Sequence, residues 1–265
     1  MTDTVLLPAK ETNLSIAWGK AFLHIMENAG TEISPLIVTI KGFDNGVPKE
    51  NNQIREALDK TLESYQEQSV HTVANTIFPE SLWRYAEYDR HRLYEIYMKS
   101  MPRRKALSPR KNNRGLYFER LISFGSNDKF DGNQLEFIIN QYNSRKSVRK
   151  SMFQASIFDP MRDHTPVARL GFPCLQHISL IPVGKNLTLN AFYATQRIFQ
   201  KGYGNFLGLC RLGNFMAYEM KLNLNQMNCF IGLEKLEEVN GKHSIKLKNL
   251  VKIVRDVIRT TEGQI

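Results

Sequence analysis

Residues 172–177 read Phe172-Pro173-Cys174-Leu175-Gln176-His177 and lead into an apolar run at 178–183, a Gly-Lys-Asn turn and a second apolar run at 187–192. Two short apolar runs joined by a turn predict a β-hairpin. Residues 205–222, which follow, are apolar on nearly every side and predict a central buried helix. A cysteine after a proline at the edge of a hairpin is held in a fixed place, as a nucleophile must be. The alternative is an inert, structural Cys174.

The rest of the chain also contains both helix-like and strand-like patterns. Its apolar periodicity predicts helices at 13–29, 52–66, 77–98, 133–143 and from 249 onward, and strands at 35–41 and 227–232. Residues 116–124 fit a short strand or helix, and residues 243–247 a strand or loop. The basic stretch 101–114 contains two prolines and predicts a mobile loop, and residues 151–166 look irregular. We therefore expect one α+β domain over residues 1–265, with a mostly antiparallel sheet packed with helices around the long central helix.

The chain is basic, with 36 Lys and Arg against 26 Asp and Glu and a net charge of +10. Such a balance favours anionic partners. The charge gathers in two clusters, which are either solvated faces or sites for phosphate or a polyanion. A nucleic-acid-binding protein that uses residues 101–114 is therefore one hypothesis. The clusters are Arg103, Arg104, Lys105, Arg110, Lys111 and Arg114, and then Arg145, Lys146, Arg149 and Lys150.

Several function classes find no support in the sequence. No apolar run reaches about 18 residues, which argues against a membrane-spanning helix, and residues 1–10 do not resemble a signal peptide. The three cysteines show no CxxC spacing, so we expect a reducing, cytoplasmic setting without a disulfide framework. The histidines His71, His164 and His177 lack metal-ligand spacing, and we expect no metal.

A series of short motifs in residues 34–236 resembles the thymidylate synthase and deoxycytidylate hydroxymethylase family. Cys174 after Pro173 resembles the nucleophile motif, and Asn205 stands 31 positions later, as the family's pyrimidine-reading residue does. Glu80 opens a Glu-Ser-Leu-Trp segment similar to the family's Glu-x-Leu-Trp, and Tyr117 stands where the family keeps an active-site tyrosine. Residues 35–41 resemble a family strand, and residues 147–150 resemble a segment that reaches a phosphate across the dimer interface.

The resemblance implies a thymidylate synthase-like fold, a homodimer, and a pyrimidine nucleotide or derivative as ligand. The implied activity is methyl or hydroxymethyl transfer at C5 through the cysteine, with methylenetetrahydrofolate as cofactor. A thiolate that adds to C6 makes C5 nucleophilic toward a one-carbon unit. The implied site residues are Cys174, Glu80 and Tyr117 for catalysis and Asn205, Thr195, Arg149 and Lys150 for the substrate.

The sequence departs from the family pattern at positions that bind the phosphate, the sugar and the folate in the family. Leu175 follows the cysteine where the family has histidine. The family's strand arginine and aspartate are both missing from their places in the stretch Tyr193-Ala194-Thr195-Gln196-Arg197, where Ala194 stands at the arginine position. Arg197 is three residues from position 194 and is expected to face the other side of the strand. Lys235 and Glu237 replace a His-x-Tyr pair, and the family's Gly-rich start and C-terminal closing segment are not recognisable. Standard thymidylate synthase activity is thus expected to be weak or absent.

A second hypothesis follows: a non-catalytic or regulatory nucleotide-binding protein that kept the fold, in a specialised bacterial pathway or a defence system. Each site residue also has a structural alternative. Asn205 is either the reader of a uracil-like base or a helix N-cap. Glu80 either relays protons or is a first-turn glutamate after Pro79. Tyr117 is either an active-site or a core residue, and the 149–150 pair is either a phosphate site or solvated charge.

Overall fold

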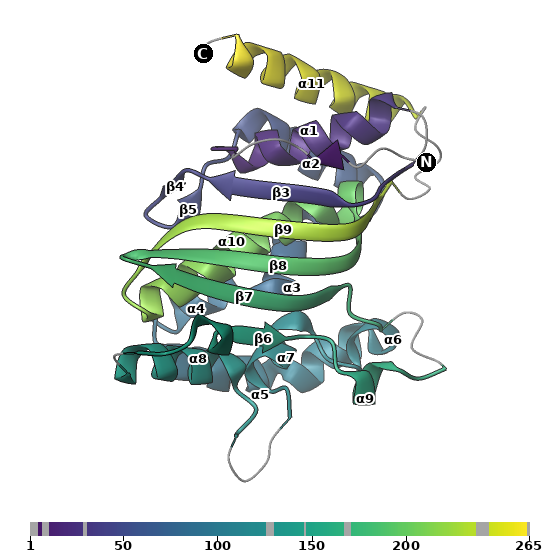
Figure 1. Cartoon of the computed structure of the whole chain (residues 1–265). Helices are drawn as coiled ribbons and strands as arrows, with labels where there is room; N and C mark the ends of the chain where they lie inside the picture. The colour runs from purple at the N-terminus through teal and green to yellow at the C-terminus, as the bar shows by residue number, and fades with distance from the viewer. Residues whose placement is uncertain are drawn as a thin grey trace.

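A single mixed sheet forms the centre of the molecule (Figure 1). The computed structural model describes residues 5–6, 11–28, 31–125, 130–145, 147–166, 171–236 and 244–263. The strands of the sheet follow the order β1-β3-β9-β8-β7-β6, with β2 paired to β9 beyond the end of β3. The strands are β1 (Val5–Leu6), β2 (Glu32–Ile33), β3 (Leu36–Lys41), β6 (Gln154–Ser156), β7 (Leu175–Val183), β8 (Asn186–Arg197) and β9 (Asn223–Lys235).

Strand pairing confirms the hairpin and the mostly antiparallel sheet. β7 and β8 are antiparallel, with Ile178 opposite Ala191, and β3 is antiparallel to β9, with Leu36 opposite Ile231. β8 and β9 are parallel. A parallel pair needs a long crossover, and residues 198–222 supply it. The small hairpin β4 (Phe43–Asp44) and β5 (Val47–Pro48) follows β3 at the predicted Asn45-Gly46 turn, where both residues have positive φ.

The helices cover one face of the sheet and its two edges. Figure 1 shows α10, α3 and α4 behind the sheet, α1, α2 and α11 beyond β3, and α5, α7 and α8 beyond β6. No described helix lies over the front face. The helices are α1 (Leu14–Glu27), α2 (Asn52–Ser64), α3 (Val70–Ile77), α4 (Glu80–Tyr85), α5 (Arg90–Leu107), α6 (Pro109–Asn112), α7 (Tyr117–Ile122), α8 (Gln134–Ser144), α9 (Pro160–Asp163), α10 (Tyr203–Glu219) and α11 (Ile245–Glu262), with a 3-10 turn at Lys150–Met152 and a π-helix at Ile198–Gly202.

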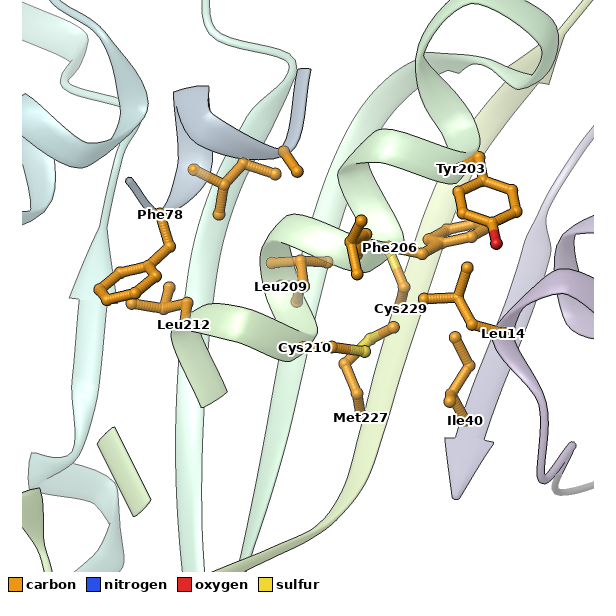
Figure 2. Close-up of a cluster of buried hydrophobic side chains, with 14 of the residues drawn as sticks. Leu14, Ile40, Phe78, Tyr203, Phe206, Leu209, Cys210, Leu212, Met227 and Cys229 are labelled. Atoms are coloured by element: carbon orange, nitrogen blue, oxygen red, sulfur yellow. The ribbon is translucent and has the colours of Figure 1, made fainter. Parts of the chain in front are cut away.

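The core forms around α10, the predicted central helix. Figure 2 shows Phe206, Leu209 and Cys210 of this helix among side chains of β9, and all three are fully or almost fully buried. The partners on β9 include Met227 and Cys229, both with no exposed surface. Burying a side chain of this size stabilises a fold by about 1.5–3 kcal/mol. The apolar character of α10 on nearly every side is explained by its place between the sheet and α3.

Two glycines on α10 let it approach α3 closely. A Cβ at Gly204 would lie 2.5 Å from the Cβ of Val73, and one at Gly208 would lie 2.8 Å from the Ala74 carbonyl oxygen. Neither distance is sterically allowed, so only glycine permits this helix contact. The same contact fixes the first turn of α10, which carries Asn205.

We expect Gly204→Ala to destabilise the protein by about 1–3 kcal/mol, because overpacking forces the two helices apart. This outweighs the better helix propensity of alanine, about 1 kcal/mol. Urea unfolding would measure it. Gly263→Ala is the matched control, since its Cβ meets nothing closer than the Arg259 carbonyl oxygen at 3.2 Å. Equal stability of the two variants would contradict the close approach.

The prediction of a mobile loop at 101–114 is wrong. α5 continues through Pro102 to Leu107, and α6 follows. Tertiary contacts hold this region in place: Met101 is buried, and the Arg104 guanidinium lies 4.8 Å from the centre of the Tyr97 ring. Lys105 Nζ lies 2.7 Å from Glu119 Oε1 on α7. These contacts outweigh the backbone hydrogen bond that a proline removes.

Other boundaries also differ from the predictions. The helix predicted at 77–98 is two helices, because Glu87 and Tyr88 have positive φ and Asp89 Oδ1 caps α5 by accepting from the Arg92 amide. Residues 117–122 form a helix rather than a strand. The irregular segment 151–166 contains β6 and α9, and α11 begins at Ile245, capped by Ser244, so the strand or loop expected there is absent from the described part.

Candidate functional site

A cavity of about 460 Å³ opens at the end of β8. This volume suits one small-molecule ligand. The cavity brings together four of the predicted site residues: Cys174, Tyr117, Thr195 and Asn205. The remaining lining residues are Gln68, Val73, Thr76, Gly115, Leu116, Gly171, Phe172, Pro173, Gln196, Arg197, Lys201 and Lys235.

Cys174 lies directly before β7 and is half-buried. Its carbonyl oxygen accepts a hydrogen bond from the Ala194 amide at 2.9 Å, which extends the β7–β8 pairing by one position. The Thr195 hydroxyl lies 3.7 Å from its sulfur. The backbone of Cys174 is therefore fixed by the sheet, and its thiol lines the cavity.

Tyr117, the first residue of α7, stands against Cys174. Burial raises the pKa of the Tyr117 hydroxyl, and the neighbouring Cys174 raises it further, while backbone hydrogen bonds from Leu175 and Cys174 act in the opposite direction. The hydroxyl thus keeps its proton at neutral pH and can donate it in a hydrogen bond. Tyr193 lies in the adjacent core, fully buried, with a hydroxyl that has no hydrogen-bond partner among the described residues.

Asn205 is not a helix N-cap, so that interpretation is wrong. α10 begins at Tyr203, and Asn205 lies inside its first turn. Its Nδ2 donates to Gln196 Oε1 at 2.7 Å, and Gln196 Nε2 donates to Glu234 Oε2 at 2.8 Å. All three side chains are at least 94% buried. Sequence reasoning missed Gln196 and Glu234, because their contact joins neighbouring strands, β8 and β9, that are distant in sequence.

Glu234 is an unusual carboxyl group. Burial raises its pKa to about 8, against the effect of hydrogen bonds from Gln196 and from the Lys235 backbone. Its second oxygen, Oε1, has no hydrogen-bond partner among the described residues. No local pattern in the sequence marks Glu234, because the buried positions Met227, Cys229 and Ile231 alternate with a period of two that would place residue 233 inside instead.

Three cations line the cavity: Arg197, Lys201 and Lys235. Arg197 and Lys235 are paired on the adjacent strands β8 and β9 and so lie side by side. Arg197 lines the cavity together with Thr195, two residues earlier on β8, whereas Ala194 is not among the lining residues. Lys201 Nζ donates to Gln68 Oε1 at 2.5 Å, and Lys235 Nζ lies 3.5 Å from Glu32 Oε1. The described lining contains no carboxylate, so the cavity favours an anion.

Glu80, Arg149 and Lys150 lie elsewhere. Glu80 is the first residue of α4, in agreement with its interpretation as a first-turn glutamate, and its carboxylate lies 3.1 Å from Arg211 Nε. It is not a lining residue of the cavity. Arg149 and Lys150 line a separate groove of about 920 Å³ near the β7–β8 turn. Arg145, Ser147 and Lys221 also line this groove.

Some predictions fall on residues outside the described part, namely Lys146, Glu237 and the last two positions, 264–265. Among the described residues, no group of His, Cys, Asp and Glu side chains is placed to hold a metal ion. In the same part of the chain, every helix is too short or too polar to cross a bilayer.

Comparison with known protein families found no family model that matches the chain, and a search of curated proteins found no significant match. The geometry of the cavity is therefore the main basis for assigning a function.

Proposed function

We propose that this protein binds a pyrimidine nucleotide or a close derivative in the cavity of Cys174 and acts at C5 of the ring in thymidylate synthase-like one-carbon chemistry. One observation carries the proposal. Cys174, Tyr117 and Asn205 come from three separate segments, and the fold brings all three to one cavity. These are residues that the family resemblance assigns to nucleophile, active-site tyrosine and base recognition.

The proposed chemistry begins with the Cys174 sulfur. The Cys174 thiolate forms a bond to C6, and the C5–C6 π electrons move to C5, which becomes the nucleophile. Bound methylenetetrahydrofolate would supply the one-carbon unit at the oxidation level of formaldehyde, with its nitrogen as the leaving group, and also the hydride if the product is a methyl group; water would complete a hydroxymethyl product. Loss of the C5 proton to solvent and departure of the thiolate from C6 restore the ring. Tyr117, as a protonated hydroxyl next to the sulfur, donates a hydrogen bond toward the reacting ring. Methylenetetrahydrofolate is the proposed one-carbon donor. Cys174, Tyr117 and Asn205 act only on the pyrimidine in this proposal.

The cationic residues of the cavity support an anionic ligand. Arg197, Lys201 and Lys235 take the place of the arginine and the sugar-binding pair that the family resemblance calls for but the sequence lacks. Charge-assisted hydrogen bonds to phosphate are roughly twice as strong as neutral ones. We therefore propose that the phosphate of the nucleotide lies against these residues.

A non-catalytic nucleotide-binding protein is the second candidate. It is favoured by the position of Glu80, which pairs with Arg211 and does not line the cavity, so no described carboxylate there relays protons. The nucleic-acid hypothesis loses support from α5, where Arg104 and Lys105 make contacts within the protein.

Calorimetry with uridine and uridine monophosphate tests the proposal. We expect the monophosphate to bind, and Arg197→Ala to weaken it about 10- to 100-fold through loss of a charged hydrogen bond worth about 1.5–3 kcal/mol. Binding of uridine should change little. Lys248→Ala, an exposed position on α11, is the control. No binding of any pyrimidine nucleoside or nucleotide would exclude the proposed function.

We also propose a homodimer that forms through the open face of the sheet. The rings of Phe192 and Phe230 stack on this face at 5.5 Å and are 40% and 39% exposed. Beside them, Asn228 accepts from Thr39 and donates to Asn190, so the face is part apolar and part polar. Such a mixture is typical of interfaces.

Sedimentation at micromolar concentration is expected to give about twice the chain mass of 30.6 kDa. Phe230→Asp should shift the protein toward the monomer, because it places a charge in the centre of the interface. Val183→Asp, exposed at the end of β7, is the control. A wild-type protein that remains monomeric would rule out a phosphate contribution from Arg149 or Lys150 across the interface.

A further inference from the structure

We propose that Gln196 and Glu234 are positioning residues that orient the amide of Asn205, so that the cavity selects a ring with an N–H donor at this point. The inference rests on the proposed function, since it specifies which pyrimidine the site prefers. Neither residue belongs to a motif in which the sequence resembles a known family. The argument depends on the direction of two buried hydrogen bonds.

Glu234 determines which way the Gln196 amide points. A carboxylate has acceptors only, and its Oε2 accepts from Gln196 Nε2 at 2.8 Å. A protonated Glu234 with its hydrogen on Oε1, the oxygen without a described partner, leaves Oε2 as the same acceptor. The Glu234 side chain has no exposed surface, so water does not compete for this contact.

The orientation of the Gln196 amide in turn determines the orientation of the Asn205 amide. Because the NH₂ group of Gln196 faces Glu234, its oxygen faces Asn205 and accepts from Nδ2 at 2.7 Å. A flipped Asn205 amide would place two carbonyl oxygens against each other in a buried site, which costs the full hydrogen bond and adds repulsion. Asn205 is therefore held in one of its two amide orientations.

The orientation determines what the ligand must offer. With Nδ2 committed to Gln196, Oδ1 is the free acceptor of Asn205, and the second Nδ2 hydrogen remains available as a donor. A uracil-type ring presents an N–H at N3 beside a carbonyl oxygen, which matches this pair. A cytosine-type ring presents an acceptor beside an amino group, which is the reverse pattern. The selected class is thus an imide-containing pyrimidine.

The experiment compares uridine and cytidine monophosphate by calorimetry on the wild type, Glu234→Gln and Gln196→Met. We expect the wild type to prefer the uridine ligand at least tenfold. Glu234→Gln should reduce this preference several-fold, because an amide at 234 can face Gln196 with either its oxygen or its NH₂ group. Glu219→Gln is the matched control: it makes the same chemical change at the far end of α10, where the carboxylate pairs with Arg90 at 3.0 Å.

A second readout separates this inference from the proposed function. The side-chain NH₂ signals of Asn205 and Gln196, assigned by their loss in Asn205→Asp and Gln196→Met, are followed by ¹⁵N NMR without ligand. Glu234→Gln should shift both and speed the solvent exchange of the Asn205 pair, and Glu219→Gln should not. Unchanged Asn205 signals in Glu234→Gln overturn the inference even if no nucleotide binds, and an unchanged uridine preference overturns it while the proposed function stands.

Discussion

Iodoacetamide is expected to modify Cys174 at least a hundredfold faster than Cys210 or Cys229 in the folded protein. Cys174 is half-buried and lines the cavity, whereas the other two have no exposed surface. Burial raises the pKa of both core thiols, and each pH unit by which a pKa rises reduces the reactive thiolate about tenfold. Mass spectrometry of peptides after short exposure measures the three rates separately.

Two controls make this result specific. Cys174→Ser should leave almost no native labelling, and denaturant should bring the three rates close together. Uridine monophosphate should protect Cys174 if the ligand lies over the thiol. A Cys174 that reacts as slowly as the core thiols would exclude covalent chemistry at this residue.

Asp163→Ala is expected to destabilise the protein by about 3–5 kcal/mol, the usual effect of leaving a buried charge without its partner. Arg120 on α7 and Asp163 on α9 are both almost fully buried and form two parallel hydrogen bonds of 2.6 and 2.7 Å. Arg120 also donates to the Arg114 and Ile157 carbonyl oxygens at 2.8 Å each. The pair thus holds the chain just before Gly115 and Leu116, which form one wall of the cavity.

Denaturant unfolding across pH gives this prediction a second test. Burial acts to raise the pKa of Asp163, but hydrogen bonds from Arg120 and the Asp159 amide hold it below its ordinary value. Its contribution to stability is therefore complete above the ordinary carboxyl pKa and is lost as pH falls through the lowered one. The difference between wild type and variant should shrink in acid. Glu95→Gln removes an exposed pair with Lys99 and should leave the unfolding midpoint unchanged.

The elements with strong periodicity were predictable from the sequence. A long apolar run predicts α10, because a helix buried between a sheet and other helices must be apolar on nearly every side. Two apolar runs around a Gly-containing turn predict the β7–β8 hairpin. The breaks and continuations were not predictable. Pro102 predicts the end of a helix, yet a cation–π contact of Arg104 and an ion pair of Lys105 stabilise the helix beyond it. Such contacts exist only once α5, α6 and α7 are packed together.

The candidate site was predictable in part. Cys174, Tyr117, Thr195 and Asn205 were expected at one site from the family resemblance, and all four line the cavity. The contact between Gln196 and Glu234, and the position of Arg197 beside Lys235, depend on the register of β8 against β9. No local pattern in the sequence reveals this register. Arg149 and Lys150 look like a phosphate site in sequence, but their groove is separate from the cavity within one chain.

The long separation between β3 and its partner β9 affects how the protein is made. β3 ends at Lys41, and β9 begins only at Asn223. At a synthesis rate of roughly 5–20 residues per second, β3 emerges from the ribosome about ten to forty seconds before β9 exists. During that interval Leu36, Val38 and Ile40 are apolar side chains on a strand without its central neighbour. The nascent chain therefore exposes this apolar surface until β9 has been synthesised, and the centre of the sheet closes only then.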